Sequence, residues 1–132
     1  METFLKEAKE ASRVLMSISG ADKKNILLAM AQALREHMQE LIKANTLDMK
    51  AGEENNLSSA LMDRLLLDEN RIEAMALAIE EIAALRDPVG RILDGWVTEN
   101  ELRMQKVSIP IGVIGIIYES RPNVTSDTAA LC

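Results

Sequence analysis

A run of seven residues, Ile111 to Ile117, is apolar or glycine without a break. The run is too short for a helix and rich in β-branched side chains, so it predicts a strand that is buried on both faces. Such strands belong to parallel sheets covered by helices, and each needs neighbouring strands and crossover helices. The chain offers one such strand in 132 residues. We therefore expect it to be the front part of a longer α/β protein.

The first 86 residues predict a series of helices, because apolar residues recur at intervals of three and four. The stripe of the second helix runs from Ile26 to Ile42, and that of the last from Ile72 to Ile82. Asp22 and Asp68 are the predicted N-caps of these two helices. The predicted helices cover residues 4–18, 22–42, 46–53, 58–66 and 68–85.

From Pro88 the pattern changes to two short extended runs, at residues 96–98 and 102–109, with Glu99 and Asn100 as the predicted turn. After the buried strand, Pro122 disfavours helical backbone at Arg121. Residues 123–132 then predict the first turns of another helix.

Charge and cysteine content narrow the possible functions. With 21 acidic and 15 basic side chains, the net charge is −6, and no basic block is present. We therefore expect neither nucleic acid nor a membrane as a partner. One cysteine, Cys132, allows no internal disulfide, and His37 has no second histidine beside it, so no metal site is expected. The N-terminus lacks a signal-peptide core, and we expect a cytoplasmic protein.

Two stretches resemble a known enzyme family. DPVGRILDGW (87–96) and IPIGVIGIIYESRPNVT (109–125) resemble the gamma-glutamyl phosphate reductase (glutamate-5-semialdehyde dehydrogenase) family of the aldehyde dehydrogenase superfamily. The resemblance extends over essentially the whole chain and is most specific in IYESRPN. It implies an aldehyde-dehydrogenase-like α/β fold. Residues 1–87 would form the helical N-terminal segment, 88–110 an extended hairpin and connecting region, and 111–132 the first strand and the start of a helix of an incomplete NADPH-binding domain.

The resemblance also implies a reaction, the NADPH-dependent reduction of L-glutamate 5-phosphate to glutamate 5-semialdehyde and phosphate in proline biosynthesis. In this family a cysteine thiolate attacks the acyl phosphate, phosphate leaves, and hydride reduces the thioester. We expect that cysteine beyond residue 132, and for Cys132 itself we expect apolar packing in its helix. The small-molecule substrate is the expected partner, the full-length enzyme is expected to be a homo-oligomer, and this chain alone is expected to be inactive.

Asn123 is the strongest candidate for a catalytic residue. The resemblance implies that its side-chain amide helps to hold the oxyanion of the tetrahedral intermediate, because a neutral amide N–H is a fixed donor that needs no titration. The alternative is that Asn123 caps the final helix.

Other candidates flank Asn123. Arg121 is predicted to bind the phosphate or carboxylate of the substrate, with a surface or interdomain ion pair as the alternative. Ile117, Tyr118, Glu119 and Ser120 align with the superfamily segment that lines the nicotinamide and ribose of the cofactor, mostly through backbone, although Glu119 could instead pair with Arg121. In this alignment the segment carries two extra residues relative to typical aldehyde dehydrogenases.

Three residues of the extended region have further interpretations. Gly112 and Gly115 lack the spacing of a dinucleotide fingerprint and predict close backbone approach. The superfamily uses this region in subunit assembly, so Trp96 is predicted either to anchor an interface or to pack within its own chain.

Two other interpretations stay open. The chain could be a short non-catalytic module that associates with another chain through exposed apolar edges around residues 111–117. It could also belong to a different enzyme of the aldehyde dehydrogenase superfamily.

Overall fold

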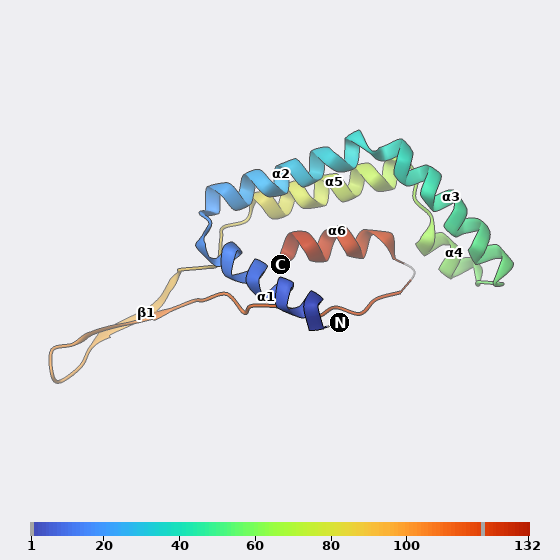
Figure 1. Cartoon of the computed structure of the whole chain (residues 1–132). Coiled ribbons are helices and arrows are strands. Elements are labelled where there is room, and N and C mark those ends of the chain that lie inside the picture. Colours follow the sequence, from blue (N-terminus) through green and yellow to red (C-terminus); the bar gives the residue numbers. More distant parts are fainter. Residues whose placement is uncertain (1, 120) are drawn as a thin grey trace. The chain divides into compact units, whose positions relative to one another are not determined.

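The computed structural model describes residues 2–119 and 121–132, which form helices and one hairpin (Figure 1). Contacts divide these residues into two units, one of residues 2–20 and 86–114, and the other of 21–85, 115–119 and 121–132. The elements in chain order are α1 (Glu2–Ser17), α2 (Gly20–Glu36), α3 (Met38–Glu54), α4 (Ser59–Leu65), α5 (Glu69–Ala84), β1 (Ile92–Val97), β2 (Arg103–Val107) and α6 (Pro122–Leu131).

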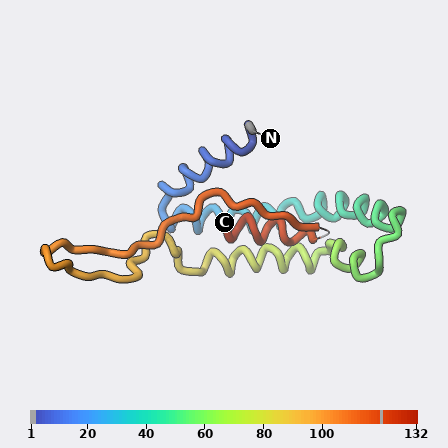
Figure 2. The backbone as a smooth tube through the Cα atoms, turned by 90° about the horizontal axis from the view of Figure 1, so that it is seen from below, coloured from blue at the N-terminus to red at the C-terminus, as the bar shows by residue number. Residues whose placement is uncertain are grey.

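Helix α5 provides most of the core of the second unit. Five of its residues are buried at helical spacing, and of these Ile72 and Ile79 have fully buried side chains. Ala31 of α2 and Ala130 of α6 pack with α5 residues in one cluster, and Figure 2 shows α6 lying along α2 and α5. The buried residues of α5 are Ile72, Met75, Ala76, Ile79 and Ala83.

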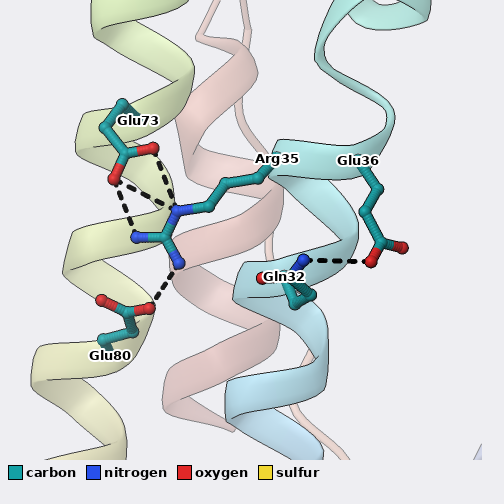
Figure 3. A network of polar contacts seen from close by, with 5 residues as sticks. All are labelled: Gln32, Arg35, Glu36, Glu73 and Glu80. Atoms are coloured by element: carbon teal, nitrogen blue, oxygen red, sulfur yellow. Dashed lines mark hydrogen bonds and ion pairs between the residues drawn. The ribbon is translucent and has the colours of Figure 1, made fainter.

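An ion-pair cluster joins α2 to α5 beside this core (Figure 3). Arg35 Nη2 donates to Glu73 Oε1 at 2.8 Å and Nε donates to Glu73 Oε2 at 3.0 Å, while Nη1 donates to Glu80 Oε1. Glu73 and Glu80 are two helical turns apart and therefore lie on the same face of α5. One guanidinium can bond to both carboxylates because it has several N–H donors. These hydrogen bonds hold the pKa of Glu73 and of Glu80 below the ordinary value of 4.5 and raise the pKa of Arg35.

The second predicted helix is divided differently in the structure. Helix α2 ends at Glu36 and α3 begins at Met38, and between them His37 has φ −99° and ψ 14°. Backbone hydrogen bonds into and out of His37 continue the helical pattern, so the departure from helix is local. The helix also begins earlier than predicted, at Gly20, so Asp22 lies in its first turn and is not the N-cap.

The predicted helix boundary near Asn45 is wrong, because α3 continues through this residue to Glu54. Asn45 is 3% exposed, and its amide bonds outside its own helix. Nδ2 donates to the carbonyl of Leu65 at 2.8 Å, and Oδ1 accepts from the N–H of Leu67 at 2.7 Å. Since this side chain is occupied by the α4–α5 connection, it does not compete with the α3 backbone for hydrogen bonds.

The helix starts predicted near Ser58 and at Asp68 are confirmed. Ser58 is the N-cap of α4, although its hydroxyl makes no capping hydrogen bond. Asp68 Oδ1 accepts from the N–H of Arg71 at 2.7 Å, which satisfies one free donor of the first turn of α5.

The first unit contains the antiparallel hairpin of β1 and β2. Trp96 pairs with Met104, and the predicted turn between the strands is confirmed. Thr98 closes that turn, because its N–H donates to the carbonyl of Leu102 at 3.0 Å. At the other end, Ser108 Oγ accepts from the N–H of Arg91 at 3.1 Å, so the hairpin is fixed at both ends.

The structure assigns no strand to residues 111–119, which differs from the prediction for Ile111–Ile117. A strand is defined by its hydrogen-bonded neighbours, and in the described residues β1 and β2 pair only with each other. The segment is exposed, with Ile111 at 88% and Ile117 at 102% of full exposure. Gly112 has φ +104°, and no described atom crowds it, so conformation and not close approach explains this glycine.

None of the helices in the described residues has the length and apolar character needed to cross a membrane.

We predict that Asn45→Ala destabilises the chain by about 2 to 4 kcal/mol, because the change leaves the Leu65 carbonyl and the Leu67 N–H without their buried partners. Urea unfolding followed by circular dichroism measures this. Asn70→Ala, at an exposed residue of α5, is the matched control and should change the free energy of unfolding by no more than about 0.5 kcal/mol. Equal effects of the two substitutions would contradict the prediction.

We predict that Arg35→Gln lowers the thermal midpoint at pH 7 and that this loss shrinks in acid. The folded-state pKa values of Glu73 and Glu80 lie below 4.5, so the stabilisation is complete above pH 4.5 and is lost as the pH falls through the folded-state values. Midpoints measured from pH 7 to 3 test this. Arg13→Gln, which removes an exposed pair with Glu10 in α1, should have a smaller effect. A loss from Arg35→Gln that is independent of pH would refute the ion-pair explanation.

Candidate functional site

A cavity of about 290 Å³ lies in the second unit, between the α4–α5 region and the start of α6. Its floor is mainly apolar, and four side chains with polar groups line it: Arg64, Arg71, Asn123 and Asp127. The apolar or proline lining residues are Leu66, Leu67, Ala74, Met75, Ala78 and Pro122. The strongest sequence candidate, Asn123, therefore lines this cavity together with three charged side chains. We call this cavity the α5–α6 pocket.

The local sequence places Asn123 one residue inside α6. Arg121 is the N-cap, with φ −140° and ψ 88°, and Pro122 follows at the first helical position, where a missing N–H costs nothing. Asn123 therefore does not cap the helix, and the capping alternative is wrong. Its Nδ2 donates instead to Asp127 Oδ2 at 2.9 Å, one turn further along α6. One N–H of the amide is fixed by this bond, and the other remains available to a ligand.

The two carboxylate oxygens of Asp127 have different surroundings. Oδ2 accepts from Asn123, whereas Oδ1 is buried and accepts no hydrogen bond from any described residue. A buried carboxylate oxygen without a donor is costly, and most such atoms in proteins have a partner. Asp127, which lines the α5–α6 pocket, thus has one carboxylate oxygen without a donor from the described residues.

Of the two arginines of the pocket, one is hydrogen-bonded within the chain and the other is not. Arg71 is held in place, because Nη2 donates to Asp63 Oδ1 at 2.6 Å and Nη1 donates to the carbonyls of Asp63 and Leu66. Arg64 is exposed and makes no hydrogen bond or ion pair with the residues that the structure describes. Arg71 therefore ties α4 to α5, while the guanidinium of Arg64 is available to an anion.

The predicted cofactor segment lies directly before α6. The hydroxyl of Tyr118 is 2.6 Å from Thr125 Oγ1, which links this segment to α6, and Ile117 and Glu119 are exposed. Ser120 lies outside the described residues. Arg121 is exposed, is not among the residues that line the pocket, and forms no ion pair with Glu119 in the described chain. The assignments of these five residues stay predictions.

Three residues that line the pocket were not predicted from the sequence: Arg64, Arg71 and Asp127. For Asp127 a signal existed, since it follows Asn123 by four residues in a predicted helix and must share its face. For the arginines no local signal existed, because α4 and α5 reach α6 only through tertiary packing.

The two remaining sequence candidates lie elsewhere. Cys132 is exposed, so the predicted apolar packing of this thiol is wrong for the structure. His37 is exposed, with Nδ1 at 3.1 Å from Glu40 Oε2, beside a second, mostly apolar cavity. Among residues 2–119 and 121–132, no cluster of three or more His, Cys, Asp or Glu side chains could hold a metal ion.

No family model matches the chain. Curated relatives match it over its whole length: the gamma-glutamyl phosphate reductase of Sulfurimonas denitrificans is 73% identical over 132 residues, and that of Nitratiruptor sp. is 60% identical. Each alignment covers 100% of this chain and 32% of the relative. The chain thus spans about a third of the length of these relatives.

Solved structures agree with these matches. The crystal structure of gamma-glutamyl phosphate reductase from Thermotoga maritima has a TM-score of 0.92 and 42% identity, covering 96% of this chain and 30% of that one. The Saccharomyces cerevisiae enzyme has a TM-score of 0.89 and 32% identity, covering 96% of this chain and 32% of that one. In sequence and in fold, therefore, this chain is similar to about a third of the length of these gamma-glutamyl phosphate reductases, and its fold class is aldehyde-dehydrogenase-like α/β.

Proposed function

We propose that this chain is part of an enzyme that reduces L-glutamate 5-phosphate with NADPH to glutamate 5-semialdehyde and phosphate, a step of proline biosynthesis. The observation that carries the proposal is the 73% identity, over all 132 residues, with a protein named gamma-glutamyl phosphate reductase. The whole enzyme is a cytoplasmic homo-oligomer in this proposal. The domain division at residues 87 and 110 is retained, with residues 111–132 opening the NADPH-binding domain.

In this proposal Asn123 stabilises the charge that develops on the acyl oxygen. A cysteine thiolate from the remainder of the enzyme attacks the acyl phosphate, and the carbonyl oxygen becomes an oxyanion before phosphate leaves. Asn123 Nδ2 is fixed by its 2.9 Å bond to Asp127, so its second N–H is held ready for that oxygen. A donor fixed beforehand needs no reorganisation when the charge forms, which favours the transition state over the ground state.

The segment before α6 is proposed to contact the cofactor. NADPH, when bound, supplies the hydride that reduces the thioester. Residues 117–119 are exposed and lie outside any helix or strand, so their backbone N–H and C=O groups are accessible to a ribose or nicotinamide amide. Ser120 completes the proposed segment, and Arg121 is proposed to bind the phosphate or carboxylate of the substrate.

Exposed apolar residues support a larger assembly. Ile109, Ile111 and Ile117 are each at least 80% exposed, which is unfavourable for side chains of this size in water. In our proposal the remaining strands of the enzyme cover this segment. A separate association module remains the second candidate, because the same exposed segment could be covered by another chain.

We predict that Asn123→Ala in the reductase that carries this chain lowers kcat by about 10² to 10³, with a smaller change in KM, because the lost donor acts mainly on the transition state. Steady-state NADPH oxidation with L-glutamate 5-phosphate measures both constants. Asn70→Ala is the control and should leave kcat unchanged. An Asn123→Ala enzyme with normal kcat would remove Asn123 from catalysis, and turnover by the pure 132-residue chain would contradict the proposal as a whole.

A further inference from the structure

We propose that the α5–α6 pocket recognises the amino-acid head group of the substrate, with Asp127 binding the α-ammonium and Arg64 the α-carboxylate. The inference rests on the proposed function, because it assumes a substrate derived from glutamate. It adds two specificity residues to that function. Each binds one of the two opposite charges on the α-carbon of the substrate.

Asp127 has the properties of an ammonium acceptor. Oδ2 is fixed by Asn123 and Oδ1 is buried without a donor from any described residue, so the carboxylate is oriented and half of its capacity is unused. A primary ammonium has three N–H donors and forms short, charge-assisted hydrogen bonds with a carboxylate. Asp127 lines the pocket, and rotation of its carboxylate would turn the buried Oδ1 toward the α-ammonium and give this atom the partner that no described residue supplies.

Arg64 has the properties of the matching carboxylate site. It lines the same pocket, is exposed, and bonds to no described residue, whereas Arg71 is already occupied by Asp63. A free guanidinium can bind a carboxylate through two parallel hydrogen bonds. The apolar lining of the pocket, which includes Met75 and Ala78, suits the methylene groups that extend from the α-carbon of a glutamyl chain.

The spacing of Asp127 and Asn123 is also compatible with the length of the substrate. Asp127 and Asn123 are hydrogen-bonded neighbours at 2.9 Å on one face of α6. In glutamate 5-phosphate, three carbon atoms separate the ammonium nitrogen from the reactive acyl carbon. A substrate with its ammonium on Asp127 can therefore extend along α6 and bring its acyl oxygen to the second N–H of Asn123. Asp127 would then bind the ammonium, and Asn123 would stabilise the charge on the acyl oxygen.

The test compares two aldehydes in the reductase that carries this chain, run in the oxidising direction with NADP⁺ and phosphate. The first is L-glutamate 5-semialdehyde, and the second is glutarate semialdehyde, which has the same carboxylate and aldehyde but no ammonium. We expect the wild type to prefer the first by about 10- to 100-fold in kcat/KM, the value of one charged hydrogen bond. Asp127→Asn, which keeps the shape of the side chain, should abolish this preference by raising KM for the first aldehyde alone.

Arg64→Gln tests the other half of the site. It should raise KM for both of these aldehydes and leave 4-aminobutanal, which has the ammonium but no carboxylate, unaffected. Asp48→Asn on α3 is the matched control, since it removes a carboxylate from an exposed residue that does not line the pocket. It should preserve the full preference of the wild type.

Two results would overturn the assignment and leave the proposed function standing. One is a wild-type enzyme that oxidises both semialdehydes equally well, a comparison that does not depend on the folding of any variant. The other is an Asp127→Asn enzyme whose kcat/KM falls equally for both, which would make Asp127 a purely structural residue. An enzyme with no activity on L-glutamate 5-semialdehyde would instead overturn the proposed function, and the head-group assignment with it.

Discussion

The buried face of α5 is the constraint on which the second unit depends. Ile72 and Ile79 are excluded from water, and Ala31 of α2 and Ala130 of α6 pack into the same core. Arg35 adds a polar connection at the edge of this core, through two carboxylates of α5 (Figure 3). Because interiors are close-packed, the position of α6 along α5 is set by these side chains. The start of α6, with Asn123 and Asp127, is consequently placed beside the α4–α5 connection and forms the α5–α6 pocket with it.

In our proposal this chain supplies groups that bind the substrate and one donor for the oxyanion, and the remainder of the enzyme supplies the nucleophile. The chain contributes a fixed amide donor, an acceptor with unused capacity and a free guanidinium, all on rigid helices. It spans 32% of the length of its curated relatives, and in our proposal the nucleophile and most of the cofactor site belong to the remainder. Residues 111–119 are exposed and precede α6 in the sequence. Completion of a sheet around them would fix the start of α6 from its other end, so folding of the whole enzyme and assembly of its site would be coupled.

Local physics made much of the fold predictable. The α5 stripe and its Asp68 cap, like the hairpin turn, follow from spacing and residue type within a few positions. Features that depend on long-range contacts, such as the helix through Asn45, were not predicted correctly. A helix boundary was predicted near Asn45 because the partners of its side chain cannot be seen in the local sequence. These partners, the backbones of Leu65 and Leu67, are about twenty residues away. Of the polar residues that line the pocket, Asn123 was a candidate from its motif, whereas Arg64 lines the pocket from α4, which no local pattern connects to α6.

A crystal structure of the reductase that carries this chain, with L-glutamate bound, would test the central claim most directly. Our account predicts the ammonium within hydrogen-bonding distance of Asp127 Oδ1, the α-carboxylate on Arg64, and the side-chain carboxylate directed toward Asn123 Nδ2. L-Glutamate bound away from the α5–α6 pocket, or bound there with its ammonium turned away from Asp127, would contradict it.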